Sequence, residues 1–243
     1  MTEYKVKEDN NCVIVEGVKD FVPKHIFECG QCFRWVKDNE AEGRYIGVAS
    51  GKVAAVSMID TNTLKIENTN RKEFYDFWYT YFDLGRDYSE IKRIVSKDDI
   101  MRKAVEFGSG IRILKQDFNE ILISFIISAN NRIPRIMNSV ETLSRIFGEK
   151  ICFNGREYYS FPNLDIISGL SVEDINVCKA GFRCGYIYNT SRAVNGTDFT
   201  DEITRESLMK LSGVGPKVAD CILLFSGLAY DAFPTDVWVK RVM

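Results

Sequence analysis

A lysine that follows a glycine turn and precedes a downstream aspartate is the part of this sequence best suited to chemistry. The turn is Gly213-Val214-Gly215-Pro216, Lys217 comes next, and Asp236 follows 19 residues later. An unprotonated lysine amine is a nucleophile that forms an imine at a carbonyl carbon. A fixed carboxylate can stabilise positive charge as it develops. The pattern therefore indicates covalent catalysis, with Lys217 as the nucleophile and Asp236 as its carboxylate.

These residues need a helix that begins at the turn. The two glycines permit positive φ and close approach of a partner to the backbone. Pro216 suits the first turn of a helix, and apolar residues then recur at helical spacing, namely Val218, Cys221, Ile222 and Phe225. Residues 202–211 predict a preceding helix, and the start of the second offers free N–H groups to an anion such as phosphate. The alternative is an ordinary turn with a solvated Lys217 and an Asp236 that only caps a helix.

The composition is that of a folded protein with room for one large or two modest domains. The chain has 243 residues, of which 45% are hydrophobic and 27% charged, and its formal net charge is −2. Bulk charge therefore does not predict a nucleic-acid partner, and any DNA binding would depend on local groups. The polar start has no signal-peptide pattern, and the apolar run 121–129 is too short to span a bilayer. We expect a cytoplasmic protein without a membrane partner.

The seven cysteines favour a reduced protein, because their number is odd and most lie in apolar surroundings. Cys29-Gly30-Gln31-Cys32 could be a redox pair or half of a zinc site. No βαβ pattern supports the redox interpretation, and Cys178 and Cys184 are too widely spaced in sequence for a usual second zinc pair. There is no run of four cysteines near the C-terminus, so the sequence does not indicate an iron–sulfur cluster. We therefore expect that no cofactor is required.

The hydrophobic pattern divides the chain into a β-rich part and a helical part. Strands are predicted at residues 12–15, 33–36, 44–48, 52–56 and 64–67. Helices are predicted at residues 74–81, from 87, from 98, and at 117–129, 132–147, 163–169, 172–178 and 183–195, with a loop at 151–162. The expected fold class is α+β. An N-terminal antiparallel sheet domain would span residues 1–105, and an all-α domain residues 106–243.

Four separated segments resemble the 8-oxoguanine DNA glycosylase/lyases of the helix-hairpin-helix superfamily. These are residues 30–35 (GQCFRW), residues 116–136 with QDFNE, SFI and NNRIPRI, residues 181–186 (GFRCGY), and the hairpin 211–220 with Lys217 and Asp236. Lysine-bearing endonucleases of the same superfamily share the hairpin but lack the first segment. The resemblance implies a TBP-like sheet domain followed by a helix-hairpin-helix glycosylase domain.

The resemblance also implies a reaction and a set of contacts. The enzyme would extrude 8-oxoguanine from duplex DNA, remove it through an imine on Lys217, and cut the strand by β-elimination. Phe182 would be the wedge beside the lesion, and Asn130, Arg135 and Arg183 would bind the base opposite, with Asn131 in the same DNA-contacting loop. Gly30, Cys221 and Phe225 would form the lesion pocket. The backbone of Gly213, Gly215 and Val218 would contact phosphate. The plainer alternatives are core packing for Phe182 and Cys221 and a solvated face for the arginines.

Further expectations concern ions, partners and chain length. By the resemblance, the carbonyls of Met209, Leu211 and Val214 would bind a structural monovalent or calcium cation. The partner would be double-stranded DNA with 8-oxoguanine or an abasic site, and the protein a monomer, nucleoid-associated in a bacterium or nuclear in a eukaryote. In the family further helices follow the aspartate, so we expect a chain truncated at its C-terminus. Two alternatives stay open, namely a glycosylase for another damaged base and a non-catalytic DNA-binding fragment.

Overall fold

The computed structural model describes residues 4–195, 203–237 and 239–242. The chain forms two compact units. The first consists of Met1–Val48 and Val53–Lys115, and the second of Ala49–Lys52 and Gln116–Met243. Residues 106–115, which were expected in the helical domain, are thus grouped with the sheet.

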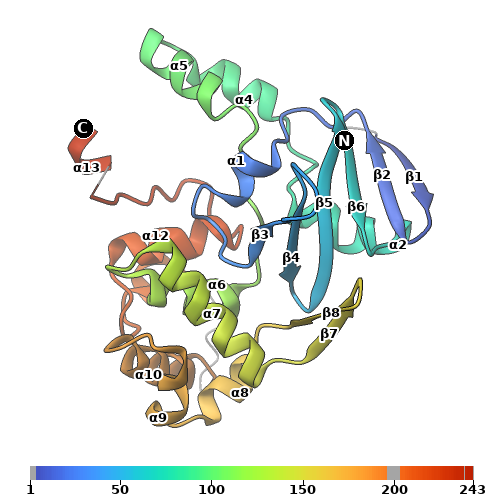
Figure 1. The fold of residues 1–243 in the computed structure, drawn as a ribbon. Coiled ribbons are helices and arrows are strands. Elements are labelled where there is room, and N and C mark those ends of the chain that lie inside the picture. The colour runs from blue at the N-terminus through green and yellow to red at the C-terminus, as the bar shows by residue number, and fades with distance from the viewer. Residues whose placement is uncertain (1–3, 196–202, 238, 243) are drawn as a thin grey trace. The chain divides into compact units, whose positions relative to one another are not determined.

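One antiparallel sheet organises the first unit (Figure 1). Its strand order is β1-β2-β6-β5-β4-β3. The strands are β1 (Lys5–Asp9), β2 (Cys12–Glu16), β3 (Trp35–Lys37), β4 (Tyr45–Ala49), β5 (Lys52–Asp60) and β6 (Thr63–Glu67). In the centre of the sheet, Val13 pairs with Ile66 and Val15 with Leu64, and all four side chains are buried. These alternate apolar residues face one side because successive side chains of a strand point to opposite faces.

Helices and an aromatic core complete the first unit. The helical segments are α1 (Pro23–Phe27), α2 (Arg71–Glu73), the π-helical η1 (Phe74–Trp78), α3 (Tyr79–Tyr81), α4 (Tyr88–Val95) and α5 (Asp99–Phe107). Asp98 caps α5 by accepting from the N–H of Met101. The rings of Phe27 and Trp35 stack with centroids 4.4 Å apart, and Trp35 donates from Nε1 to the Tyr81 hydroxyl at 2.8 Å. This core supports β3, which begins at Trp35, the last residue of the segment 30–35.

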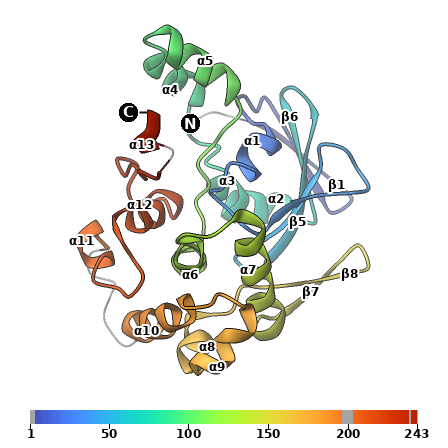
Figure 2. The same cartoon turned by 60° about the vertical axis from the view of Figure 1, so that its left-hand side comes forward.

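The second unit is built around α6 (Phe118–Ser128), whose residues from Glu120 to Ile127 are all buried. Helices α7, α10 and α12 pack against it (Figure 2). The other segments are α7 (Ile133–Phe147), α8 (Leu164–Gly169), α9 (Val172–Ile175), η2 (Asn176–Cys178), α10 (Arg183–Asn195), α11 (Arg205–Leu208), α12 (Pro216–Phe225) and α13 (Val239–Val242). A helix that is apolar on every side must be buried on every side. This explains the central place of α6 in the unit.

The predicted fold class is confirmed, with several local differences, among them the short helices α1 and α2, which were not predicted. A hairpin of β7 (Lys150–Phe153) and β8 (Arg156–Tyr159) forms where the sequence analysis expected a loop. Its turn is Asn154-Gly155, both with positive φ, which is the turn chemistry of a two-residue hairpin. Strand β1 was not predicted, and α11 is shorter than the expected helix 202–211, of which residue 202 lies outside the described residues. In the described part of the chain, no helix has the length and apolarity to cross a membrane.

Candidate active site

The glycine hairpin is held in shape by its own backbone and by two residues of α10. Gly213 has φ of +80°, and the N–H of Val214 donates to the Leu211 carbonyl at 3.2 Å. A Cβ on Gly213 would lie 2.7 Å from the Tyr186 ring. Thr190 donates from Oγ1 to the carbonyl of Ser212 at 2.8 Å. Glycine is therefore required at 213 both by its conformation and by the ring beside it.

Helix α12 begins as the sequence predicted, with Gly215 as its N-cap and Pro216 in its first turn. Among the described residues, the backbone N–H groups of Gly213, Gly215 and Val218 have no hydrogen-bond acceptor. Several free N–H groups at the positive end of a helix dipole form a site for an anion. The structure thus brings together the three backbone groups that were expected to bind phosphate.

Lys217 lies half-buried against aromatic and thiol groups of the second unit. Its Nζ is 5.1 Å from the centroid of the Phe125 ring and forms a hydrogen bond with the thiol of Cys221, one turn further along α12. Cys221 is only 2% exposed, and burial raises the pKa of this thiol to about 11, while the Lys217 amine acts to lower it. The amine therefore does not project freely into solvent.

Asp236 caps α13 and acts on the same thiol. Its Oδ1 accepts from the N–H of Val239 at 2.9 Å, and its carbonyl accepts from the N–H of Lys240 at 3.1 Å. The Asp236 charge contributes to the raised pKa of Cys221, in the direction opposite to Lys217. Lys217 and Asp236 thus both lie within electrostatic reach of Cys221. Capping of α13 and an electrostatic effect on Cys221 are thus combined in one residue.

Phe182 is 63% exposed, so it does not belong to the packed core. Its ring lies edge-on to Tyr186, with centroids 5.7 Å apart, and the Arg183 guanidinium lies 4.4 Å from its centroid. The ring is therefore presented to solvent and held on two sides. This arrangement suits a side chain that enters a stack of bases, as was expected for Phe182.

Of the residues predicted to contact DNA at the loop after α6, some are exposed and others form hydrogen bonds within the protein. Asn130 and Arg135 are exposed, whereas Asn131 donates from Nδ2 to the Ile127 carbonyl at 3.1 Å. Arg183 is buried and donates to the backbone carbonyls of Ala129, Asn130 and Ala180. Burial lowers the pKa of Arg183, and nearby Arg135 adds to that effect. In this structure Asn131 and Arg183 shape the loop, and Asn130 and Arg135 face outward.

Gly30 belongs to the first unit, where Gln31 fixes its surroundings. Gly30 has φ of +85°. Gln31 is 1% exposed and donates from Nε2 to the carbonyls of Ile26 and Arg112 at 2.9 and 2.8 Å. Its Oε1 accepts from the N–H of Leu114 at 2.9 Å. Gln31 therefore ties the segment 30–35 to residues 112–114. These bonds of the buried amide restrain the backbone at Gln31, directly after Gly30.

The cysteines form no disulfide. All seven are free thiols, and Cys29 and Cys32 donate to the carbonyls of Ile26 and Phe27. Cys178 and Cys184 share a thiol–thiol hydrogen bond, and burial raises the pKa of Cys178 to about 12. In residues 4–195, 203–237 and 239–242, no group of three or more His, Cys, Asp or Glu side chains is arranged to hold a metal ion.

Two residues near the site were not assigned a role from the sequence. Phe125 lies in a helix whose residues are apolar all round, so periodicity does not show which of them faces Lys217. Tyr186 lies in the segment 181–186, and its contact with Gly213 joins positions 27 residues apart in sequence. Helical spacing after Arg183 identifies the helix but not this contact.

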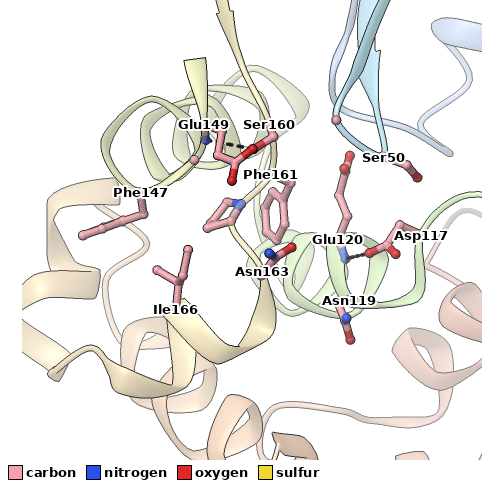
Figure 3. A pocket seen from close by; sticks show the side chains of 13 residues that line it. Ser50, Asp117, Asn119, Glu120, Phe147, Glu149, Ser160, Phe161, Asn163 and Ile166 are labelled. Carbon is pink, nitrogen blue, oxygen red and sulfur yellow. Dashed lines mark hydrogen bonds between the residues drawn. The ribbon is translucent and has the colours of Figure 1, made fainter. Parts of the chain in front are cut away.

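A cavity of about 330 Å³ in the second unit is lined by none of the predicted site residues (Figure 3). Its walls carry the carboxylates of Asp117, Glu120 and Glu149, together with Ser160. The N–H of Glu120 donates to Asp117 at 3.0 Å, and the N–H of Glu149 donates to Ser160 Oγ at 2.9 Å (Figure 3). A wall of negative charge repels phosphate. We do not place base removal in this cavity.

Two family models match the chain. One is described as 8-oxoguanine DNA glycosylase, N-terminal domain, and matches residues 13–122. The other is described as helix-hairpin-helix motif and matches residues 202–225. The two matches fall on the sheet unit with the start of α6 and on the glycine hairpin with α12.

Known proteins resemble the chain over most of its length. It is 34% identical to the probable N-glycosylase/DNA lyase of Methanothermobacter thermautotrophicus, over 67% of this chain and 60% of that protein. It is 34% identical to the N-glycosylase/DNA lyase OGG1 of Arabidopsis thaliana, over 89% of this chain and 63% of that protein. The chain therefore spans about three fifths of the length of these curated relatives.

A solved structure is similar in both sequence and fold. It is the Clostridium acetobutylicum 8-oxoguanine glycosylase/lyase in complex with double-stranded DNA containing cytosine opposite 8-oxoguanine. The identity is 46%, the TM-score is 0.94, and the match covers 98% of this chain and 84% of that chain.

Proposed function

Because this chain belongs to the 8-oxoguanine DNA glycosylase/lyase family, we propose that it removes 8-oxoguanine from duplex DNA and cuts the strand at the resulting abasic site. The observation that carries this proposal is the setting of Lys217. Its amine lies at the start of a helix behind a glycine hairpin, in contact with Cys221, and Asp236 acts on the same thiol. A nucleophile, a carboxylate and an anion-binding backbone are what an imine-forming glycosylase requires.

The reaction begins with extrusion of the target nucleotide from the stack. The lone pair of Lys217 Nζ attacks C1′, and the bond from C1′ to the base breaks, so that the base leaves with the electron pair and takes up a proton. The C1′–O4′ bond then opens to give an imine on Lys217. Loss of the C2′ proton expels the 3′ phosphate oxygen with its electron pair, which cuts the strand. Asp236 stabilises the positive charge that develops on the sugar.

The DNA contacts follow from the surface of the second unit. Phe182 would enter the stack beside the lesion, and Asn130 and Arg135 would meet the base opposite. Free N–H groups of the glycine hairpin would bind a phosphate. In the first unit, the Gly30 carbonyl would accept from N7–H of 8-oxoguanine, a proton that guanine lacks. Cys221 and Phe225 would line the pocket in the second unit. We propose a monomer that acts on DNA in the nucleoid or the nucleus.

A cation at the hairpin is part of the proposal. The carbonyl oxygens of Met209 and Val214 accept no hydrogen bond in the part of the chain that the structure describes, and that of Leu211 accepts one from Val214. Carbonyl oxygens of this kind suit a hard cation. Met209, Leu211 and Val214 would hold it, and it would add positive charge beside the bound phosphate.

Borohydride trapping tests the proposal. With a duplex that contains 8-oxoguanine opposite cytosine, the wild-type chain should form a reduced covalent complex and cut the lesion strand, and Lys217→Gln should do neither. Equal trapping by Lys217→Gln would remove Lys217 as the nucleophile. A panel of duplexes, each with one lesion, separates 8-oxoguanine from another damaged base. Binding to abasic duplex without any cleavage would instead indicate a DNA-binding fragment.

A further inference from the structure

The ring of Phe125 faces the reacting nitrogen of the proposed site. Its centroid lies 5.1 Å from Lys217 Nζ, and the side chain is only 2% exposed. On α12 the ring of Phe225 stacks on it, with centroids 5.4 Å apart and 21° between the planes. Phe125 is thus fixed by the buried helix α6 and by a second aromatic ring. The face of an aromatic ring attracts a cation within about 6 Å of its centroid, and the attraction grows where water is excluded.

We propose that Phe125 is a further catalytic residue of the lyase step, and that its ring stabilises the cationic imine nitrogen on Lys217. The inference rests on the proposed function. It assigns to Phe125 a contact with a reacting atom, in addition to its place in the core of the second unit.

The charge on the nitrogen changes during the step. On an opened abasic sugar, Nζ adds to the aldehyde carbon C1′, and the former carbonyl oxygen leaves as water with one proton from Nζ and one from solvent. The product is a C1′=N double bond with a positive nitrogen. That nitrogen then draws the electron pair of the C2′–H bond as the 3′ phosphate oxygen departs. A group that stabilises this cation raises the fraction of enzyme that is poised for elimination.

A neutral group is best suited to stabilise the cationic nitrogen beside these neighbours of Nζ. The Cys221 thiol has a pKa raised to about 11 by burial and therefore carries no negative charge at neutral pH. A carboxylate attracts a cation, but its oxygens also accept protons. The ring of Phe125 offers negative potential without a proton-accepting atom, so it stabilises the cation without competing for its proton.

A fluorine series at position 125 isolates this role. Replacing Phe125 by 4-fluoro-, 3,5-difluoro- and pentafluorophenylalanine weakens and then reverses the negative face with little change in shape. The substrate is a duplex with a preformed abasic site opposite cytosine. The borohydride-trapped fraction and the single-turnover rate of strand cleavage should fall in that order, by about tenfold across the series. Duplex affinity, measured by fluorescence anisotropy, should stay constant.

The matched control is the same series at Phe161, a buried ring of the second unit on the wall of the cavity in Figure 3. Its cleavage rates should equal those of the wild type. Equal rates along the Phe125 series, or the same fall at Phe161, would overturn the role of Phe125. In both cases wild-type trapping that depends on Lys217 would leave the proposed function intact. Absence of wild-type trapping would instead overturn the proposed function and this inference with it.

Discussion

Arg183 donates from Nη2 to the backbone carbonyl of Asn130 at 2.8 Å. Its Nε donates to the carbonyl of Ala129 at 2.7 Å, and its Nη1 donates to that of Ala180 at 3.1 Å. Asn130 has φ of +50°, a conformation that few residues adopt without support. Arg183 therefore joins the start of α10 to the end of α6 and stabilises the turn that exposes Asn130.

Replacing Arg183 by methionine should destabilise this turn. The change leaves three backbone carbonyls without their donor, and we expect the free energy of unfolding to fall by about 1–3 kcal/mol. Urea unfolding followed by circular dichroism measures the loss. The control is Arg135→Met, at an exposed position, which should alter stability by less than about 0.5 kcal/mol. It should nevertheless weaken duplex binding, with a smaller salt dependence. Equal losses of stability for both variants would contradict the role given to Arg183.

The two glycines of the hairpin should respond differently to alanine. Gly213→Ala places a methyl group at φ of +80° and 2.7 Å from the Tyr186 ring, so unfolding should become easier by about 1–3 kcal/mol. Gly215→Ala meets nothing within 4 Å, and its φ is −95°, so stability should change little. The added methyl should nevertheless hinder a phosphate and weaken duplex binding. Thermal unfolding and anisotropy separate the two effects, and a fully stable Gly213→Ala would refute this account.

Asp236→Asn should separate the charge of this residue from its capping role. An asparagine oxygen can accept from the N–H of Val239 as the carboxylate does, so α13 should keep its start. The negative charge is lost, and single-turnover excision of 8-oxoguanine should slow by about 10²–10³-fold. Asp236→Ala, which loses both roles, should also lower the unfolding midpoint in urea. Excision by Asp236→Asn at the wild-type rate would mean that the charge is not used.

The Cys221 thiol should make stability depend on alkaline pH. Burial raises its pKa from 9.0 to about 11, so the folded state binds the thiol proton more tightly than the unfolded state does. Its contribution is complete below pH 9 and is lost as the pH rises from 9 to about 11. Between pH 8 and pH 11, the wild type should lose roughly 2 kcal/mol more unfolding free energy than Cys221→Ala. Parallel curves for the two proteins would show that this thiol does not titrate as described.

The sequence predicted those elements whose signals are local. Helices were predicted to begin at Asp98 and at Asp117, and each of these residues caps the helix that follows it, while the predicted helix 183–195 coincides with α10. Strand β1 escaped prediction because only one of its five residues is buried. The hairpin of β7 and β8 escaped prediction because an Asn-Gly turn also suits a loop, and only the pairing of the two strands distinguishes the two. In both cases pairing with a neighbouring strand decides the structure, and pairing is not a local property.

The candidate site divides in a similar way. The order of glycine, proline and lysine predicted the start of α12, and Asp236 does cap a helix, which was the alternative to its catalytic role. The direction of each side chain could not be predicted, because it depends on contacts between distant segments. Phe125 on α6 faces Lys217 on α12, and Arg183 donates to the backbone at the end of α6. The roles assigned in DNA recognition stay predictions.

Helix α6 carries Phe125 in its middle and leads into Asn130 just beyond its end. The proposed contact with the imine nitrogen and the proposed contact with the opposite base are thus both attached to one helix. A substitution that shifts α6 along its axis should alter both together, whereas a change in the hairpin of α11 and α12 should act on Lys217 and on the bound phosphate and leave Asn130 in place. We therefore expect substitutions in α12 to change the rate of excision. Substitutions that alter the packing of α6 should change both this rate and the preference for the opposite base.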